Sequence, residues 1–295
     1  MGAAMNLQPI NVNPDTFLRD HFVLPALPSI VNKVFAAVNS GSAGVKEVTR
    51  LISTDPAMAS HILKVVNSAY YSLPRSIGEV SYAVAYLGLG EISRIVLTLS
   101  VVGSLSPAGR TEQERFWHHS HFTAIIAKCL MKWIKNIDAI EEVYAAALLH
   151  DIGKLVYQRF FPEHYGEMVR HSEASQGFLI ESEDHFKLPS HQLFGSLLCE
   201  HWRLPKPIKK ACEFHELFQI KTITDPSQAD PFSLAITVAN LLAVLSAEQL
   251  RDPLKGEIVE ETKRVLRCSD GEFLVLMGEV YNLKIEADTF LSQLS

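Results

Sequence analysis

The sequence predicts an all-α protein, and three observations support this class. Apolar residues recur at helical spacing through most of the 295-residue chain, as in the stretch from Met58 to Val66. Helix-start signals recur as well, since Asp55 followed by Pro56 places a capping carboxylate before a proline at the first helical position. No alternation typical of a strand continues for more than a few residues. Because 47% of the residues are hydrophobic, we also expect a sizeable core rather than disorder.

The expected helices follow one another along the chain, and each is bounded by a turn signal. Two apolar helices are expected around Gly88-Leu89-Gly90, and Gly88 should end the first in a conformation that glycine tolerates. A capping box at residues 269–272 should start a helix near the C-terminus. The expected helices cover residues 56–69, 80–87, 91–104, 112–135, 139–157, 190–202, 207–218 and 232–250, with two or three amphipathic helices in 256–295.

The sequence predicts two lobes and a C-terminal extension. Residues 17–105 should form an N-terminal helical lobe, and residues 111–250 should form a helical core. The segment Ser106-Pro107-Ala108-Gly109-Arg110 combines proline and glycine and is interpreted as a hinge. We expect the amphipathic helices of residues 256–295 to pack on the core.

Composition and charge exclude several classes of function. The formal net charge of −6 argues against broad nucleic-acid binding, which requires a basic surface. The four cysteines lack CxxC spacing, so we expect reduced thiols in the core of a cytoplasmic protein. The N-terminus lacks the charged and apolar regions of a signal peptide. Glycines and charged residues interrupt the apolar zone 80–105, which therefore predicts buried helices and no membrane insertion.

The run from Leu148 to Lys154 is the most informative motif. It joins His150 and Asp151 at adjacent positions of an expected helix, where both side chains could lean onto one metal ion. Gly153 is small and could leave room for a ligand. Lys154 could offer its charge to a phosphate group.

Ten of the twelve histidines lie between His118 and His215, and hairpin geometry tests whether some of them meet. Helices joined by a short turn are antiparallel neighbours. His119 and His150 are about 18 and 13 residues from their turn, and therefore within about 8 Å along the helix axis. His191 and His215 are about 12 and 11 residues from the turn at Leu204 and should be nearly level. These four histidines and the adjacent aspartate could therefore meet in one bundle.

Imidazole and carboxylate ligands suit Zn, Fe, Mn or Ni. Such a metal could lower the pKa of a water and make a nucleophile for attack on a phosphoester. Alternatively, each histidine is a core or rim residue with no ligand. Surface or packing roles are expected for the others in this region, namely His118, His121, His164, His171, His185 and His201.

The first lobe also carries polar residues with local structural roles. Asn67 and Ser68 are expected to hydrogen-bond the backbone and to set the turn into Tyr70-Tyr71. In a second interpretation, Tyr70, Tyr71, Leu73 and Arg75 form an exposed recognition loop.

Several of these residues together resemble known families. His119-Ser120, Ala124, Ala127 and the run His150-Asp151-Ile152-Gly153-Lys154 resemble the HD metal-dependent phosphohydrolases. His191, Gly195, Trp202, Leu204-Pro205 and Phe214-His215-Glu216 are similar to the HD-GYP branch and its relatives. Four first-lobe motifs resemble the HDOD family, namely Leu24-Pro25-Ala26-Leu27-Pro28, Ile52-Ser53-Thr54-Asp55-Pro56, Val66-Asn67-Ser68-Ala69 and Ala83-Val84-Ala85-Tyr86-Leu87-Gly88. The resemblance covers about residues 24–250.

The resemblance implies an HD-like helical bundle in a bacterial signalling module. It also implies metal ligands at His119, His150, Asp151, His191, His215 and Asn240. HD enzymes carry a final metal-binding aspartate where this chain has Asn240, so one negative charge is missing. The HD-GYP branch has two successive histidines where this chain has Phe214-His215, and Glu216-Leu217-Phe218 replaces its Gly-Tyr-Pro element. A cyclic-dinucleotide phosphodiesterase of that type is therefore not expected.

Two hypotheses follow, of which we favour the first. In the first, the protein is a regulatory module with a degenerate metal site that acts through protein partners and could sense a phosphorylated small ligand. In the second, it is a metal-dependent phosphohydrolase acting on a nucleotide or another phosphoester. Asp151 and Lys154 would then serve catalysis, with Lys154 steadying the phosphate.

Overall fold

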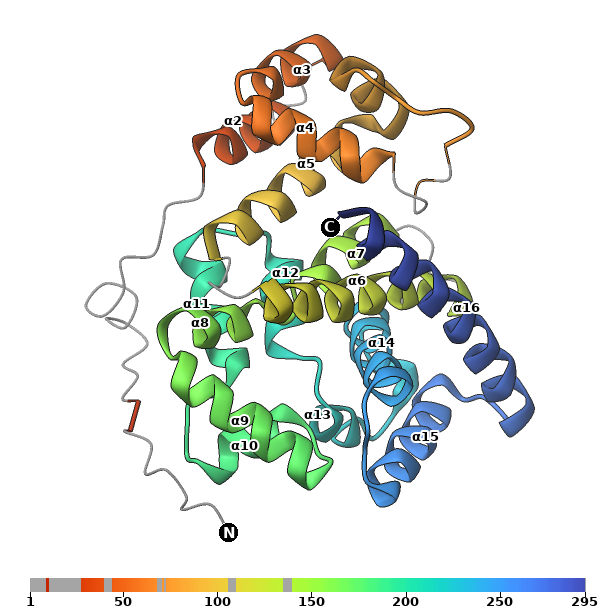
Figure 1. Ribbon diagram of the computed structural model, residues 1–295. Helices are drawn as coiled ribbons and strands as arrows, with labels where there is room; N and C mark the ends of the chain where they lie inside the picture. The colour runs from red at the N-terminus through yellow and green to blue at the C-terminus, as the bar shows by residue number, and fades with distance from the viewer. Residues whose placement is uncertain are drawn as a thin grey trace. The chain divides into compact units, whose positions relative to one another are not determined.

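The computed structural model describes residues 9–10, 28–39, 44–67, 71, 73–105, 110–134 and 140–294. Within these ranges the regular structure is helical and contains no strand, which confirms the all-α prediction (Figure 1). The chain divides into two compact units. The N-terminal unit comprises Pro25–Ser106 with Asn282–Ser295, and the core unit comprises Met1–Leu24 with Pro107–Tyr281. The lobe boundaries expected from the sequence stay a prediction, and the expected hinge at 106–109 lies outside the described residues.

The N-terminal unit packs three short helices against one long one. Helices α2, α3 and α4 each contact α5. Asp55 caps α4, because its Oδ1 accepts a hydrogen bond from the backbone N–H of Met58 at 3.0 Å, and Pro56 follows at the first helical position. Both predictions for this helix start are thereby confirmed. The helices are α2 (Ser29–Asn39), α3 (Val45–Ser53), α4 (Pro56–Val66) and α5 (Val80–Leu105).

Asn67 joins the end of α4 to the approach to α5. Its Nδ2 donates to the carbonyl oxygens of Leu63 at 2.8 Å and Ile77 at 2.7 Å. Its Oδ1 accepts from the N–H of Ile77 at 2.7 Å. The predicted backbone bonding of Asn67 is therefore confirmed. Ser68, Ala69 and Tyr70 lie outside the described residues, as does most of the first motif, residues 24–27.

Helix α5 is kinked where the sequence predicts a division. Gly88 has φ 83° and ψ 162°, a conformation that glycine adopts readily, and helical backbone continues on both sides. Among the described helices, α5 is long and apolar enough to cross a membrane, but half of its apolar window is buried within the protein. Buried core helices of this length pass the same test, so this feature agrees with the expected pair of buried helices.

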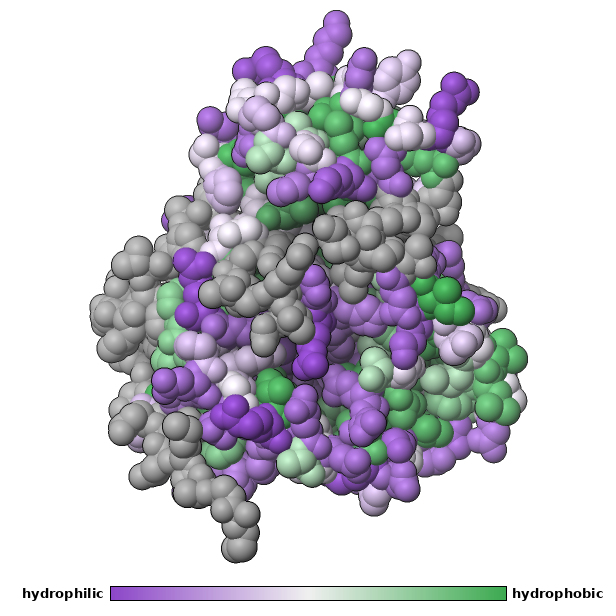
Figure 2. Space-filling view, in the orientation of Figure 1, coloured by the Kyte–Doolittle hydropathy of each residue, from purple (hydrophilic) through white to green (hydrophobic). Residues whose placement is uncertain are grey.

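The core unit is built around α6 and α14. Helix α6 contacts α7 and α14, while α11 contacts α8 and α12. Every residue of α14 from Ser233 to Val244 is buried. Figure 2 shows hydrophobic surface over α16, where Leu274 and Val275 are exposed. The helices are α6 (Arg110–Trp133), α7 (Ile140–Leu148), α8 (Ile152–Phe160), α9 (Pro162–Ser175), α10 (Leu179–His185), α11 (His191–His201), α12 (Lys206–Glu213), α13 (Leu217–Lys221), η2 (Pro226–Gln228), α14 (Pro231–Ala247) and α15 (Asp252–Leu266). Helix α16 (Asp270–Leu294) begins in the core unit, and its part from Asn282 onward is assigned to the N-terminal unit.

The capping box predicted for the last helix is present. Ser269 N–H and its hydroxyl both donate to the Glu272 carboxylate at 2.8 Å, and Glu272 N–H donates to Ser269 Oγ at 3.3 Å. These reciprocal bonds satisfy backbone donors that have no partner within the helix.

Two expected helices are wrong, and both errors affect the site. Residues 139–157 do not form one helix, because a turn at 149–151 separates α7 from α8. The N–H groups of Leu149 and His150 bond to the carbonyls three residues back, at 3.2 and 3.4 Å, which tightens the end of α7. The break at 136–138 lies outside the described residues.

The expected helix 207–218 is also interrupted. Helix α12 ends at Glu213, and His215 lies between α12 and α13. The side chain of Gln219 accepts the N–H groups of His215 and Glu216, at 2.9 and 3.0 Å, in place of helical carbonyls. The capped start of α13 changes the direction of the chain, so His215 is not part of either helix.

Candidate metal centre

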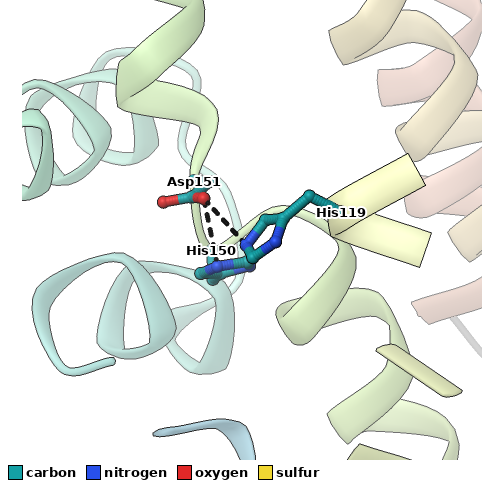
Figure 3. Close-up of side chains that lie close together, drawn as sticks. All are labelled: His119, His150 and Asp151. Carbon is teal, nitrogen blue, oxygen red and sulfur yellow. Dashed lines mark ion pairs between the residues drawn. The ribbon is translucent and has the colours of Figure 1, made fainter. Parts of the chain in front are cut away.

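Asp151 lies at the centre of the candidate site, in the turn before α8, and is fully buried. Its Oδ2 is 3.3 Å from Nε2 of both His119 and His150, as Figure 3 shows. Its Oδ1 is 3.5 Å from Nε2 of His191 and 3.4 Å from Nε2 of His215. One carboxylate is therefore shared between two pairs of imidazoles.

Three of these imidazoles are held at the nitrogen that faces away from Asp151. His150 Nδ1 is 2.6 Å from the carbonyl oxygen of Ala147, and His215 Nδ1 is 2.8 Å from that of Ala211. Nδ1 of His191 is 2.7 Å from Oε1 of Glu183. Because carbonyl and carboxylate oxygens only accept, each Nδ1 carries the hydrogen, and in the neutral ring Nε2 presents its lone pair toward Asp151. Metal-binding histidines are commonly oriented in this way.

A second carboxylate lies beside the second imidazole pair. Glu216 Oε1 is 3.4 Å from Nε2 of His191 and 3.6 Å from Nε2 of His215. The Nε2 atoms of His191 and His215 are 3.0 Å apart. This side of the site therefore concentrates two carboxylates and two imidazoles.

Several ligand atoms of the cluster are buried and lack a hydrogen-bond partner in the described part of the chain. They are Nε2 of His119, Nε2 of His150, Oδ1 of Asp151 and Oδ1 of Asn240. Buried polar atoms in folded proteins are nearly always paired. Here the unpaired atoms belong to residue types that bind divalent transition metals. Two groups of side chains are close enough to hold an ion, and both include Asp151: one adds His119 and His150, and the other adds His191 and His215. The residues therefore fit a metal.

The electrostatics of the cluster prepare it for a cation. Burial alone would raise the pKa of Asp151, but the nearby charges of His150 and Lys154 hold it well below its ordinary value. Burial lowers the pKa of His119 and of His215, which favours neutral rings. An anionic carboxylate beside neutral imidazoles is the protonation state that a metal requires.

The pKa of His191 is raised, whereas the pKa values of His119 and His215 are lowered. Burial would lower the pKa of His191, but the charge of Glu183 and the hydrogen bonds that the ring donates to Glu183 and Glu216 raise it to about 10. Burial would raise the pKa of Glu216, yet its bond to His191 and the charges of His215, His191 and Lys154 lower it. In the metal-free protein a proton on His191 therefore balances the surrounding carboxylates.

Lys154 and Asn240 also contact residues of the cluster. Nζ of Lys154 lies 2.6 Å from Oδ2 of Asp151, so the ammonium is paired inside the site. Asn240 Nδ2 donates to the backbone carbonyl of His215 at 2.9 Å, while its Oδ1 is one of the unpaired atoms. The structure thus brings together His119, His150, Asp151, His191 and His215, and Asn240 braces the backbone of one of them.

Gly153 does not leave room for a ligand, contrary to expectation. A Cβ atom built at this position would lie 1.8 Å from the carbonyl oxygen of His191 and 2.8 Å from the nitrogen of Gly195. The missing side chain is therefore needed for the close approach of α8 to the start of α11. Sequence reasoning also missed Glu183 and Glu216 as site residues. The position of Glu216 next to His215 was a signal in the sequence that could have identified it as a site residue. Glu183 contacts His191 only because the folded chain brings two different helices together.

The buried cysteines and three other histidines contact neighbouring side chains. None of the four cysteines forms a disulfide, and the buried thiols of Cys199 and Cys212 lie 3.8 Å apart. Cys129 and Cys268 are only partly buried. His121 is buried beside the hydroxyl of Tyr144, at 3.1 Å. His171 stacks on His185 with ring centroids 4.2 Å apart.

The fold and the site together define an all-helical protein with a buried candidate metal centre. The chain belongs to the HDOD family, because the model of the HDOD domain matches residues 24–218. The prediction made from the motifs is confirmed.

The chain is similar to one curated protein and to several solved structures. An uncharacterized protein of Treponema pallidum (strain Nichols) is 25% identical over 203 residues, which are 65% of this chain and 37% of that protein. The chain thus spans little more than a third of that relative's length. An HDOD domain protein with unknown function from Geobacter sulfurreducens has a TM-score of 0.73 at 22% identity, over 94% of this chain and 96% of that one.

Two further structures have a similar fold. A "Putative phosphohydrolase" from Shewanella amazonensis SB2B has a TM-score of 0.68 at 21% identity, over 92% of this chain and 95% of that one. A "Putative signal transduction protein" from Marinobacter aquaeolei VT8 has a TM-score of 0.68 at 17% identity, over 96% of this chain and 61% of that one. At these identities the likeness shows the shared helical fold.

Proposed function

We propose that this protein is a cytoplasmic HDOD signalling module that binds a divalent transition metal at Asp151 and a phosphorylated ligand beside it. The state of this site would be passed to a protein partner through the surface of the helical lobes. The observation that carries the proposal is the buried Asp151 carboxylate shared by two imidazole pairs. A carboxylate among imidazole nitrogens is a donor set that suits a divalent transition metal.

The donor set supports a transition metal rather than magnesium or calcium. Imidazole nitrogens predominate, and they suit Zn, Fe, Mn or Ni, whereas the hard alkaline-earth ions prefer oxygen ligands. The proposed ligands are His119, His150, Asp151, His191 and His215, with Oδ1 of Asn240 as the sixth. Lys154 would exchange part of its pairing with Asp151 for a phosphate oxygen of the ligand.

Regulation is favoured over turnover because the site lacks one carboxylate. Asn240 stands where HD enzymes carry an aspartate, and its amide is engaged with the carbonyl of His215. A neutral side chain there leaves a bound metal with less compensating charge. The HDOD membership and the signal-transduction name of one similar structure support the same conclusion.

Phosphohydrolase activity is the second candidate, and Glu216 favours it. This buried carboxylate lies close to His191 and His215 and could supply the charge that Asn240 does not. A bound metal would supply Lewis acidity and a water of lowered pKa. In that function, Asp151 would hold the metal together with His119, His150 and His215, and Lys154 would steady the phosphate.

Metal analysis of protein purified without chelator, together with a phosphoesterase screen, tests both candidates. For the signalling module we expect stoichiometric metal that is lost in Asp151→Ala, and no turnover. The matched control is Asp252→Ala, an exposed carboxylate paired with Lys255, which should retain the metal. Turnover that Asp151→Ala abolishes would select the hydrolase. Absence of metal after addition of Mn²⁺, Fe²⁺, Ni²⁺ or Zn²⁺ would contradict both candidates.

A further inference from the structure

The face of α8 that carries the metal site continues beyond Lys154. Asp151, Lys154 and Gln158 are spaced by three and four residues, so they follow one another along one side of the helix. Gln158 lies one turn past Lys154, about 6 Å along the helix axis. A ligand whose phosphate is bound by Lys154 would therefore extend toward Gln158.

Gln158 offers a hydrogen-bond acceptor that the described part of the chain does not use. The residue is 8% exposed, and its Oε1 has no hydrogen-bond partner. Buried glutamines normally have their oxygen paired, because an unpaired buried acceptor loses its water without compensation. Gln192 is the other buried glutamine among the described residues. Its amide nitrogen donates hydrogen bonds to the carbonyl of Glu213 and to Oε1 of Gln219. The unpaired oxygen of Gln158 can therefore accept a hydrogen bond from a ligand.

Tyr165 from α9 completes the polar surface on this side of the site. Burial raises the pKa of the Tyr165 hydroxyl, while the charge of Lys154 and the side-chain amide of Gln158 lower it, so the hydroxyl lies near both side chains. The side-chain oxygen of Gln158 has no hydrogen-bond partner in the described part of the chain. Two helices therefore bring an ammonium, an amide oxygen and a phenol to one place.

We propose that Gln158 and Tyr165 form a subsite for the sugar hydroxyls of a sugar phosphate whose phosphate is bound by Lys154. This inference rests on the proposed function and names the chemical class of its ligand. Gln158 Oε1 requires a donor, and a hydroxyl of the sugar supplies one. A cationic amine is disfavoured because Lys154 lies on the same face. Ribose 5-phosphate carries hydroxyls several ångströms from its phosphate and fits this spacing.

Calorimetric titration of the purified protein with ribose 5-phosphate and with inorganic phosphate tests the subsite. We expect the wild type to bind ribose 5-phosphate roughly 10-fold more tightly than inorganic phosphate. In Gln158→Met this preference should disappear, while affinity for inorganic phosphate stays within about 2-fold. Tyr165→Phe should reduce the preference without abolishing phosphate binding.

Stability measurements distinguish a ligand subsite from a structural role. Gln158→Met removes an unpaired acceptor at similar volume, so the melting temperature should hold or rise. Gln192→Met is the matched control and should lower it, because that amide is hydrogen-bonded. If Gln158→Met fails to fold, the proposal of a free acceptor is overturned, and Tyr165→Phe still reports on the sugar preference.

The titrations distinguish failure of the phosphate site at Lys154 from failure of the sugar subsite at Gln158. If inorganic phosphate binds and ribose 5-phosphate binds no more tightly, the subsite is wrong and the phosphate role of Lys154 stands. If neither probe binds, the proposed phosphate site fails and the subsite fails with it. If the preference survives Gln158→Met, the sugar is recognised elsewhere.

Discussion

Glu183 holds His191 at two points. Its Oε1 lies 2.7 Å from Nδ1 of the ring, and its Oε2 accepts the backbone N–H of the same residue at 3.1 Å. Glu183 is on α10 and 1% exposed, so this carboxylate fixes both the ring and the start of α11 from inside the protein. The Nε2 atom of His191 is thereby turned toward Asp151 and His215.

Glu183→Gln should weaken metal binding without removing a ligand. The amide keeps the shape of the carboxylate but loses its charge, so His191 is held less firmly and becomes less basic. Loss of such an outer partner typically lowers metal affinity by about 10- to 100-fold. Competition with a chelator of known affinity measures the change. Glu181→Gln, which alters a half-exposed partner of Arg251, should leave the affinity unchanged. Equal affinities in both variants would contradict the role assigned to Glu183.

The metal-free protein should lose stability as the pH rises above neutral. The pKa of His191 is about 10 in the folded protein and 6.5 ordinarily, so folding favours the protonated ring. Its contribution is complete below about pH 6.5 and is lost as the pH rises through about 10. Thermal unfolding with chelator present, from neutral pH to pH 10, measures the loss. Glu183→Gln should show a smaller loss than the wild type, and identical profiles would contradict this source of stability.

The stability that Asp151 contributes is lost as the pH falls, whereas that of His191 is lost as the pH rises. The pKa of Asp151 is held well below the ordinary 3.8, so its contribution is present above pH 3.8 and is lost as the pH falls through the lowered value. Asp151→Asn should therefore flatten the acid limb of the unfolding profile. The exposed Asp252→Asn serves as the control and should leave that limb unchanged. An unaltered acid limb in Asp151→Asn would count against the ion pairs described for this carboxylate.

Gly153→Ala should destabilise the core unit strongly. The added Cβ would lie 1.8 Å from the carbonyl oxygen of His191, and backbone atoms cannot yield as a flexible side chain can. Overpacking of this kind costs about 1–3 kcal/mol or more, and we expect the upper end. Gly256→Ala, in α15 with nothing within 4 Å of the built Cβ, should instead stabilise by about 0.5–1 kcal/mol. Chemical denaturation measures both, and a neutral Gly153→Ala would refute the close approach of α8 and α11.

Asn240→Asp should tighten metal binding and destabilise the metal-free protein. The new carboxylate restores a negative charge to the site but cannot donate to the carbonyl of His215 as the Asn240 amide does. We expect affinity to rise by about 10-fold, equivalent to about 1.4 kcal/mol. Metal titration and thermal unfolding with and without metal separate the two effects. Asn240→Ala is the control, since it removes the amide and adds no charge. Affinity that does not rise in Asn240→Asp would exclude position 240 from the metal site.

The sequence by itself determined the helical class, the capped start at Asp55, the kink at Gly88 and the capping box at Ser269. These features depend on residues within about four positions of one another, so local backbone preferences decide them. The distances of the histidines from the two expected hairpin turns also indicated that His119, His150, His191 and His215 could meet Asp151. That prediction needed only the rise per residue and the antiparallel packing of joined helices.

Tertiary structure alone decided how those residues face one another. The turn at 149–151 and the break at 214–216 end helices that periodicity would continue, because the side chains of His150 and Gln219 take over backbone bonds there. Glu183 reaches His191, and Gly153 meets the backbone of His191, through contacts between different helices. No local pattern encodes such contacts, because they depend on which segments pack together in the folded core.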